Sequence, residues 1–426
     1  MGTVVLFIVM FVLLIIGVPI GIALALSMIA LLWVEPVTRI AFVAQSLYSG
    51  LDSFTLLALP FFMIAGSIMD TGGISKRLVN VANSFVGNIT GGLGIVTIIA
   101  CMFFGAISGS APATVAAIGA IMIPQMIRNG YDKYYATGLV AVAGGLGVIV
   151  PLSYPMVIYG VTNNVSIGDL FLAGVGPAFV VGIILIIFNY FNCKKRGYKG
   201  SGNNFVFSNT LKAIWDAKLA LFMPVIILGG IYGGIFTATE AAVVSTVYGI
   251  IIGKFFYKEL SWEKIWNMYK ENIPFLGGMM FTFAPAAAMG SIFAYLDVPE
   301  KVNRFFLNIS TNVYIVLLLI FALLLVVGMF VQTTPAIVIL SPILLSVVRE
   351  LGVDPVHFGM IMTLGLAIAF VTPPVAANLF VAMSMTGLSM VKIVRLATPF
   401  IIGLCIALVI VGFVPQISLV FLSMVR

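Results

Sequence analysis

The chain has 426 residues, of which 62% are hydrophobic and only 8% are charged, and its mean hydropathy is +1.21. A soluble domain has about 25% charged residues, so this composition excludes a soluble enzyme and indicates an integral membrane protein. The formal net charge is +7, but the basic residues stand in short loops between apolar runs, where they orient spans and meet lipid headgroups. We therefore expect a lipid bilayer, and no nucleic acid, around this chain.

The first half of the chain contains apolar runs that predict five membrane spans. The sequence GVP at residues 17–19 interrupts the first of them, and it either separates two short spans or kinks a single one. The residues after the last span of this half, 193–217, are polar and basic and predict a cytoplasmic linker. The predicted spans cover residues 3–16, 18–34, 51–70, 135–160 and 171–192.

A further apolar stretch, about residues 92–127, is interrupted by the sequence GAISGSAPAT at 105–114. The basic residues that flank it, Arg77 and Arg128, are both predicted to face the cytoplasm, so the chain enters and leaves on one side. Each arm of about 15 residues covers about 22 Å, which is less than the hydrocarbon core of about 30 Å. We therefore predict a re-entrant helical hairpin rather than two spans.

The second half is predicted to contain the same kinds of element. A second hairpin, about residues 313–347, surrounds the sequence GMFVQTTPAI at 328–337, and the sequence WEKIWNMYKEN at 262–272 predicts an amphipathic helix on the cytoplasmic surface. The predicted spans of this half cover residues 219–236, 239–257, 273–296, 357–381 and 397–423.

The two halves, residues 1–192 and 218–426, share a pattern at a nearly constant distance. Gly105 and Pro112 correspond to Gly328 and Pro335, each 223 residues further on. Five spans per half is an odd number, so the halves are predicted to be inverted relative to each other in the membrane, with the second hairpin entering from outside and both termini outside. The other matched pairs are Pro151 with Pro373 (222 residues apart), Ser166 with Ser389 (223) and Pro177 with Pro399 (222).

Each half therefore has two interruptions in apolar sequence: the hairpin tip, and a break in a later span at PLSYP (151–155) or VTPPVAAN (371–378). Irregular backbone persists in a membrane only inside protein or beside a water-filled cavity, so four such breaks predict one shared cavity. The N-termini of half-helices suit a carboxylate, and their C-termini and freed carbonyls suit Na⁺. Hydroxyl groups that could serve either ligand are those of Ser108, Ser110, Thr114 and Ser153.

Several of these residues also have a purely structural interpretation. Gly105 and Gly109 form a GxxxG pattern, which is typical of close helix packing. Glu240 is an acid in an otherwise apolar stretch, which favours function, although it could equally cap the helix that follows it. Tyr154 and Tyr159 either line the cavity or are core aromatic residues, and the second interpretation is slightly favoured.

A membrane-embedded enzyme and an ion channel are the alternative classes. The single histidine, His357, is expected at the outer interface, and the three cysteines show no CxxC spacing, so the chain offers neither a zinc cluster nor a catalytic Ser-His pair in the bilayer. A channel normally needs a continuous pore lined by rings of charges or carbonyls. A secondary transporter fits the paired interruptions better than either class.

The sequences GAISGSAPATVAAIG, PLSYPMVIYG and FTATEAAVVSTVYG resemble the large membrane subunit of tripartite ATP-independent periplasmic (TRAP) transporters, within the ion-transporter superfamily. The likeness covers nearly the whole chain. It implies Na⁺-coupled uptake of a carboxylate-bearing solute by an elevator motion in the bacterial inner membrane, with at least two Na⁺ sites. It also implies two partners, a periplasmic substrate-binding protein and a small four-helix membrane subunit. Sialic acid is the favoured solute, and a C4-dicarboxylate or another sugar acid is the alternative.

The resemblance also implies roles for particular residues, chiefly a substrate carboxylate between Ser108 and Ser153. The family pattern PPS reads Pro151-Leu152-Ser153 here, so one proline is missing while the serine remains. The substrate residues implied are Ser108, Ser110, Pro151, Ser153 and Tyr154. The Na⁺ residues implied are Gly105, Ser108, Gly109, Ser110 and Val150 in the first half, and Gly328, Thr333, Thr334, Thr372 and Pro373 in the second.

Overall fold

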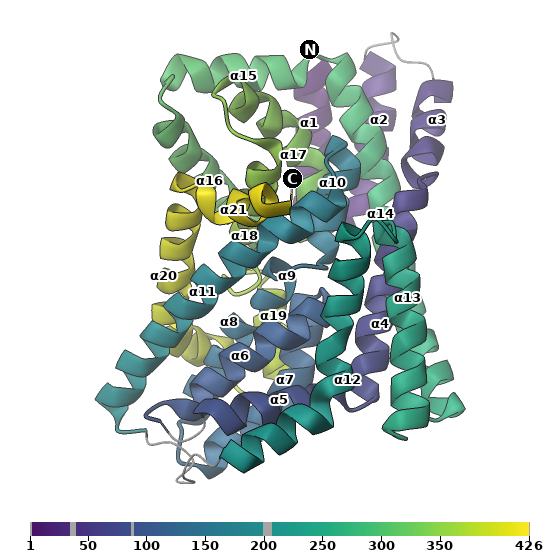
Figure 1. The fold of residues 1–426 in the computed structure, drawn as a ribbon. Coiled ribbons are helices and arrows are strands. Elements are labelled where there is room, and N and C mark those ends of the chain that lie inside the picture. The colour runs from purple at the N-terminus through teal and green to yellow at the C-terminus, as the bar shows by residue number, and fades with distance from the viewer. Residues whose placement is uncertain (1, 35–39, 87–88, 199–206, 426) are drawn as a thin grey trace.

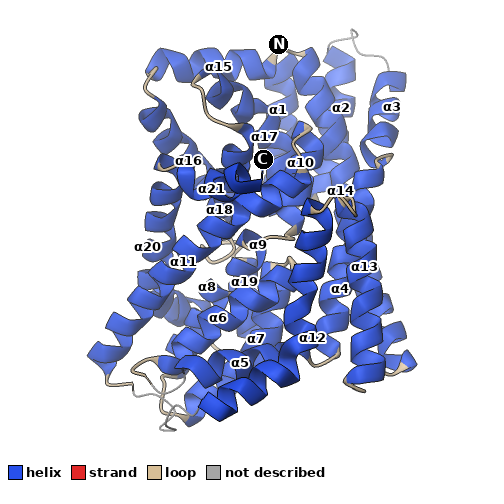
Figure 2. Ribbon diagram, in the orientation of Figure 1, coloured by secondary structure: helices blue, strands red, loops and turns tan. Residues whose placement is uncertain are grey.

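The computed structural model describes residues 2–34, 40–86, 89–198 and 207–425. Over these residues the chain is built from helices joined by turns, without a β-strand (Figure 2). Ten helical stretches in this part are long and apolar enough to cross a membrane, because a helix satisfies its own backbone hydrogen bonds where no water is present. The prediction of an all-α polytopic membrane protein is confirmed.

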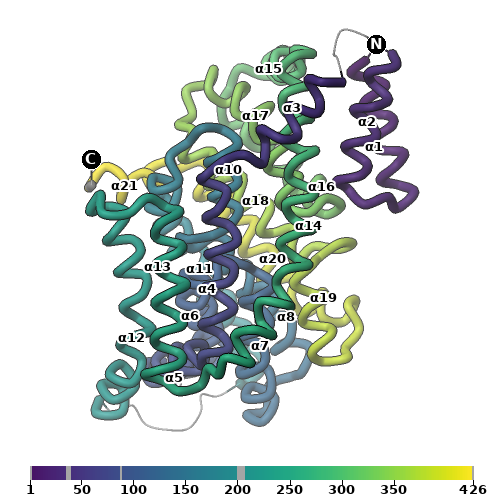
Figure 3. Tube along the Cα trace, turned by 90° about the vertical axis from the view of Figure 1, so that its right-hand side faces the viewer, coloured from purple at the N-terminus to yellow at the C-terminus, as the bar shows by residue number. Residues whose placement is uncertain are grey.

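The first two helices, α1 (Gly2–Ile15) and α2 (Ile20–Val34), pack against each other in an antiparallel pair (Figure 3). Gly17 between them has a φ of +89°, which favours glycine, and the N–H of Val18 donates to the carbonyl of Leu13 at 3.0 Å. The chain therefore reverses direction at the GVP sequence. Residues 3–34 form two short helices, and the alternative of a single kinked span is wrong.

A short amphipathic helix, α5 (Ile74–Val86), lies at one end of the molecule, where a loop was expected (Figure 1). Its buried side includes Leu78 and Val79, while Arg77 on the other side forms an ion pair with Glu259 at 2.7 Å. A second such helix, α15 (Val298–Ile309), lies at the opposite end (Figure 1). Their apolar spacing of three and four residues is the signal that the sequence analysis missed. The segment before α5 comprises α3 (Ile40–Leu51), η1 (Phe54–Leu57) and α4 (Ala58–Thr71).

Both stretches predicted as hairpins form two packed helices with a sharp turn between them. The first consists of α6 (Gly92–Ser108) and α7 (Ala111–Arg128), and the second of α16 (Val313–Phe330) and α17 (Thr333–Glu350). The first lies beside α5 and the second beside α15, so they belong to opposite ends of the molecule (Figure 1). The division into two inverted repeats, residues 1–192 and 218–426, stays a prediction. Inverted repeats would place the two hairpins at opposite ends, as they are here (Figure 1).

The spans predicted at 135–160 and 357–381 are broken in the middle. Both are buried inside the other helices: the first is buried along its whole apolar part, and the second from Val356 to Ala369. This burial explains how irregular backbone persists in the first break, which is buried throughout. The second break is only partly buried, and Pro374 within it is exposed. The helices are α8 (Lys133–Ala143), α9 (Leu146–Ile149) and α10 (Tyr154–Asn163) in the first, and α18 (Pro355–Ala369) and α19 (Ala377–Thr386) in the second.

Two predicted boundaries in the second half are wrong. WEKIWNMYKEN is not a separate surface helix but the start of α14 (Trp262–Tyr295), which continues without a break into the span. The span predicted at 397–423 ends at Phe413, because Pro415 has no N–H with which to continue the helix, and a separate helix α21 (Gln416–Val425) follows. The remaining helices are α11 (Ile167–Arg196), α12 (Phe207–Tyr232), α13 (Ala238–Ile251) with its π-helical end η2 (Ile252–Phe256), and α20 (Met390–Phe413).

Glu240 caps a helix, as one of its two interpretations predicted. Its Oε2 accepts hydrogen bonds from the N–H of Thr237 at 2.8 Å and from the Thr237 hydroxyl at 2.9 Å, and the Thr237 hydroxyl in turn accepts from the N–H of Glu240 at 3.3 Å. This is a capping box at the start of α13. The carboxylate is exposed and its Oε2 is engaged by the cap, so we assign it no part in transport.

Replacing Glu240 by glutamine should leave both solute uptake and the thermal unfolding midpoint close to the wild-type values. Glutamine at this position of a capping box supplies the same acceptor without the charge. Glu240→Ala removes the acceptor, and we expect it to lower the midpoint by a few degrees while uptake per folded molecule is unchanged. Loss of uptake in Glu240→Gln would show that the charge itself is needed.

His357 was expected at the interface, and this prediction is wrong. The residue is 1% exposed, its Nδ1 lies 3.1 Å from the hydroxyl of Ser418, and its Nε2 lies 3.3 Å from the carbonyl of Gly412. The carbonyl can only accept, so Nε2 is the donor and Nδ1 accepts from the serine. The histidine thereby joins α18 to α20 and α21. The hydroxyl of Ser418 donates to the histidine inside the protein, so this pair is not directed toward a substrate.

Candidate functional site

The tip of the first hairpin is a buried cluster of hydroxyl groups. The Oγ of Ser108 lies 3.1 Å from the Oγ1 of Thr114, which donates to the carbonyl of Ser110 at 2.7 Å. Ser108, Ser110 and Thr114 are each less than a tenth exposed. Ser110 caps α7 by accepting from the N–H of Ala113, which is the role that serine plays most readily at a helix N-terminus.

The break in the first half lies directly against this tip. The N–H of Tyr154 donates to the carbonyl of Gly109 at 3.2 Å, and a Cβ placed on Gly109 would lie 2.4 Å from the carbonyl oxygen of Leu152. Gly109 has a φ of +60° and Leu152 a φ of +76°, so each residue is in the left-handed region at the point of contact. Only glycine fits at the tip, and the structure brings the predicted residues of tip and break together.

Gly105 packs against the short helix α9 of the same break. A Cβ on Gly105 would lie 2.8 Å from the Cα of Gly147, and a Cβ on Gly147 would lie 2.6 Å from the carbonyl oxygen of Ser110. The GxxxG interpretation of Gly105 therefore holds for its packing, while Gly109 serves the turn. Gly147 is a residue of this contact that the sequence analysis did not identify.

Ser153 is fully buried at the start of α10, and its hydroxyl has no hydrogen-bond partner in the described part of the chain. A buried hydroxyl without a partner costs about 1–3 kcal/mol. The residue stands at a helix N-terminus, where the helix dipole stabilises an anion. The N–H of Tyr154 is already used by Gly109 and Pro155 has none, so the Ser153 hydroxyl is the more available donor. An oxyanion at this position would provide the partner that Ser153 lacks.

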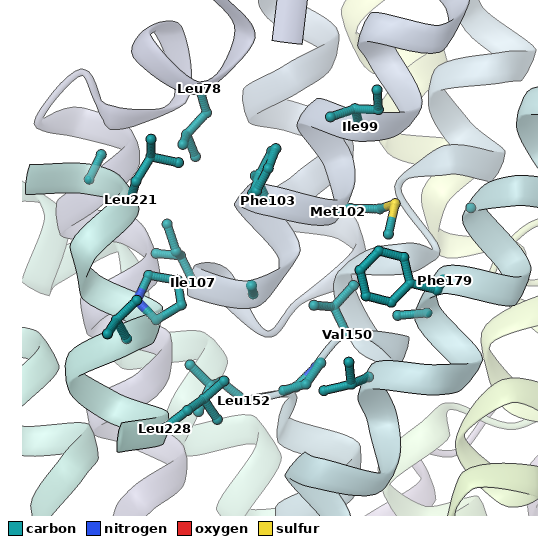
Figure 4. Close-up of a pocket in the computed structure, with 18 of the residues that line it drawn as sticks. Leu78, Ile99, Met102, Phe103, Ile107, Val150, Leu152, Phe179, Leu221 and Leu228 are labelled. Carbon is teal, nitrogen blue, oxygen red and sulfur yellow. The ribbon is translucent and has the colours of Figure 1, made fainter. Parts of the chain in front are cut away.

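Val150 and Pro151 lie on the other, apolar side of the break. Together with Leu152 they line a cavity of about 570 Å³ between α5, α6, α11 and α12. Figure 4 shows Val150 beside Phe179, and Leu152 across the space from Phe103. A carboxylate would find no partner among these side chains, so Val150 and Pro151 can offer a polar ligand only their carbonyl groups.

The second hairpin and the second break make an equivalent contact. The N–H of Val375 in the break donates to the carbonyl of Met329 near the tip at 3.1 Å, and a Cβ on Gly328 would lie 2.4 Å from the Cβ of Ala369. The remaining residues predicted here are Thr333 and Thr334, which are buried in the first turn of α17; Thr372, whose hydroxyl donates to the carbonyl of Ile368 at 2.9 Å; and Pro373, which lies in the break.

The two clusters meet at Tyr154. Its hydroxyl lies beside the side chain of Thr333, so the break of the first half touches the hairpin of the second. Tyr159, one turn further along α10, is fully buried and donates to the carbonyl of Pro355 at 2.8 Å. Tyr154 therefore belongs to the candidate site. Tyr159 is a core aromatic residue, which is the interpretation that was slightly favoured for both tyrosines.

The site is polar but carries no fixed charge. Among the described residues the buried polar side chains include no Asp, Glu, Lys or Arg, and no group of three or more His, Cys, Asp and Glu residues is placed to hold a metal. The available ligands are hydroxyls, carbonyls and helix termini. Such a donor set suits a hard monovalent cation and an oxyanion and does not suit a transition metal.

Asn378 is a second residue of this region that the sequence analysis left without a role, although it closes the sequence VTPPVAAN. It is fully buried in α19, and its Nδ2 donates to the carbonyl of Ala141 in α8 at 2.9 Å. The two residues are 237 positions apart. A lone amide side chain in an apolar span was the available signal.

Buried, broken spans that face two hairpins from opposite ends are the architecture of a membrane transport protein. The chain belongs to the family described as "Tripartite ATP-independent periplasmic transporter, DctM component", whose model matches residues 7–417. It is therefore a multi-pass inner-membrane protein of a family of transport proteins and not of enzymes, as the three quoted sequences predicted.

Several relatives carry names that state a solute. The chain is 43% identical to the isethionate TRAP transporter permease protein DctMQ of Oleidesulfovibrio alaskensis, over 94% of this chain and 63% of that longer relative. It is 39% identical to the sialic acid TRAP transporter large permease protein SiaM of Vibrio cholerae, over 90% of this chain and 89% of the relative. It is 37% identical to the C4-dicarboxylate large permease protein DctM of Pseudomonas aeruginosa, over 88% of each chain.

The fold also resembles that of a solved transporter, YdaH of Alcanivorax borkumensis. The two structures superpose with a TM-score of 0.65, over 87% of this chain and 86% of that one, at 12% sequence identity. At this identity the likeness concerns the fold alone.

Proposed function

We propose that the chain is a Na⁺-coupled secondary transporter that takes up a small organic anion. The observation that carries the proposal is a buried polar site without a fixed positive charge. A buried anion is costly unless it is paired, and in this site the partners would be helix N-termini together with Na⁺ bound at the neighbouring carbonyls. Binding of the anion and binding of Na⁺ would then favour each other, which is the thermodynamic basis of symport.

The proposed ion sites follow the two hairpins. In the first half, Gly105, Ser108, Gly109, Ser110 and the Val150 carbonyl are the proposed ligands of one Na⁺. In the second half Gly328, Thr333, Thr334, Thr372 and Pro373 are those of another. The contacts of each tip with the break of its own half support this assignment, because they bring carbonyls and hydroxyls of two segments together. The solute is proposed to lie between Ser108 and Ser153, near Tyr154.

An elevator motion of two inverted repeats is proposed as the mechanism. It is supported by the placement of the hairpins, and of the amphipathic helices α5 and α15, at opposite ends of the molecule (Figure 1). A pair of surface helices at the two ends can act as flexible connections while the hairpins and broken spans move together as one body. The fixed part would then be formed by the helices outside them.

The proposed partners are a periplasmic substrate-binding protein and a small four-helix membrane subunit. The family description, which names one component of a tripartite periplasmic transporter, supports them. For the solute we propose sialic acid, with a C4-dicarboxylate or another sugar acid as the alternative. The names of the relatives are consistent with this class, since they mention sialic acid, C4-dicarboxylates and the sulfonate isethionate.

Removing Na⁺ should abolish uptake into proteoliposomes that contain the full chain and its membrane partner. We expect accumulation only with an inward Na⁺ gradient and with the solute-loaded binding protein outside, because neither charge is stable alone in the site. Equal gradients of K⁺ serve as the control for membrane potential. Accumulation that is indifferent to Na⁺ would contradict the coupling, and single-channel currents would favour a channel instead.

A further inference from the structure

A hydrogen bond between the two halves connects the two broken spans. Asn378 is the second residue of α19, immediately after the second break, and its Nδ2 donates to the carbonyl of Ala141 near the end of α8. Ala141 stands just before the turn at Gly144 and Gly145, which leads through the short helix α9 to the first break. Asn378 and Ala141 are both fully buried. A side-chain bond over 237 residues thus joins the two segments that must hold their shape for a ligand to bind.

The acceptor is free because of the turn at Gly144 and Gly145 between α8 and α9. In a continuous α-helix the N–H of Gly145 would donate to the carbonyl of Ala141, but here it donates to Val142 at 2.9 Å. A buried carbonyl without a donor costs free energy, and Asn378 supplies that donor. The side chain therefore stabilises the interrupted form of α8 over the continuous helix.

The donor is held in place by the second break. The backbone N–H of Asn378 donates to the carbonyl of Phe370 at 3.0 Å, which closes the irregular loop, and three residues earlier the N–H of Val375 donates to Met329 of the second hairpin. On the other side, α9 beyond Gly145 packs through Gly147 against the first hairpin tip. Asn378 therefore lies in a continuous series of contacts from one hairpin to the other.

We propose that Asn378 is a positioning residue that couples the two ion-binding regions. A cation that orders either break favours the arrangement in which the Asn378 bond forms, and this in turn orders the other break. The Oδ1 of Asn378 has no partner among the described residues, so the bond to Ala141 is the side-chain hydrogen bond by which Asn378 acts. The inference rests on the proposed function where it is tested by uptake. Its test by hydrogen exchange does not depend on the proposed function.

The test uses Asn378→Leu, which keeps the branching and the number of heavy atoms of the side chain and removes the donor, although its two methyl groups make it larger. Asn303→Leu is the matched control, because Asn303 is also buried and its Oδ1 is also without a partner in the described part, but it lies in α15, away from the breaks. Asn378→Ser, which leaves room for a water molecule to bridge to Ala141, is the second variant if the leucine protein does not fold.

Hydrogen exchange of the full chain in lipid nanodiscs gives the first readout. We expect Asn378→Leu to accelerate exchange at residues 144–150 and at 370–378 together, without Na⁺, while Asn303→Leu leaves both unchanged. Faster exchange in only one of the two segments would overturn the coupling. This readout needs no transport, so it separates failure of this inference from failure of the proposed function.

Uptake kinetics give the second readout. We expect Asn378→Leu to raise the Na⁺ concentration for half-maximal uptake about 10-fold and to bring the Hill coefficient toward one, since a coupling of this size is typical between linked sites. A merely structural role would lower the amount of folded protein at an unchanged Hill coefficient. Wild-type Na⁺ dependence in a folded Asn378→Leu protein would also overturn the proposal.

Discussion

Gly109→Ala should reduce uptake at least about 100-fold, the loss expected when a functional group is displaced by about 1 Å. A Cβ at this position would lie 2.4 Å from the carbonyl oxygen of Leu152, so the tip and the break cannot stay in contact. The backbone of Gly109 also has a φ of +60°, which costs a residue with a side chain about 1–2 kcal/mol. Uptake into proteoliposomes, normalised to folded protein, measures the effect.

Gly130→Ala is the matched control for this prediction. Gly130 has a φ of +83°, but a Cβ there would meet nothing within 4 Å. It therefore introduces the same backbone strain without the collision, and we expect a modest loss of stability with uptake retained. Equal loss of uptake in both variants would attribute the effect to strain alone, and wild-type uptake in Gly109→Ala would remove the tip from the site.

The hairpins and the breaks were predictable because membranes leave few options for polar, glycine-rich sequence. An apolar helix needs neither GSAP nor TPP in its interior, so these sequences indicate irregular backbone, and irregular backbone must lie inside protein. The regular spacing between the halves then located the second set from the first. Local sequence is sufficient to predict that such a segment is irregular and shielded from lipid. The reason is that an unpaired backbone group in lipid costs several kcal/mol in any packing arrangement.

The contacts between distant segments could not be predicted in this way. Nothing in the residues around Asp354 and Pro355 indicates that α21 folds back over His357 and covers it with Ser418. The same is true of Tyr154 beside Thr333 and of Asn378 on Ala141. Each of these contacts depends on how helices far apart in the sequence pack, which the periodicity of a single segment does not encode.

The missed helices α5 and α15 illustrate a different difficulty. Both are short, contain charged residues and follow a span directly, so a search for long apolar runs assigns them to loops. Their apolar residues recur at helical spacing, and the buried face of α5 packs against α6 and α12. Amphipathicity, rather than mean hydropathy, is the property that identifies a helix lying along the surface of a membrane protein.

Ser153→Ala should abolish most uptake while leaving the protein as stable as before, or more stable. The Ser153 hydroxyl is buried without a partner in the described part of the chain, so removing it relieves an unsatisfied group rather than breaking a bond. If the hydroxyl meets the oxyanion of the solute, its loss removes a hydrogen bond to a charged group, worth about 1.5–3 kcal/mol, or a factor of about 10–150 in affinity. Opposite changes in stability and in solute affinity are the expected signature.

Thr162→Val provides the comparison that makes this result specific. Thr162 lies in the same helix, α10, and its hydroxyl is likewise buried without a partner among the described residues. Valine keeps the shape of threonine, so we expect the unfolding midpoint of Thr162→Val to stay the same or rise, as for Ser153→Ala. Its uptake, in contrast, should equal that of the wild type. If Ser153→Ala loses stability and uptake together, the hydroxyl has a structural partner within the protein. If it loses neither, the solute binds elsewhere, because a carboxylate held at this helix N-terminus would contact the Ser153 hydroxyl, which has no other partner in the described part of the chain.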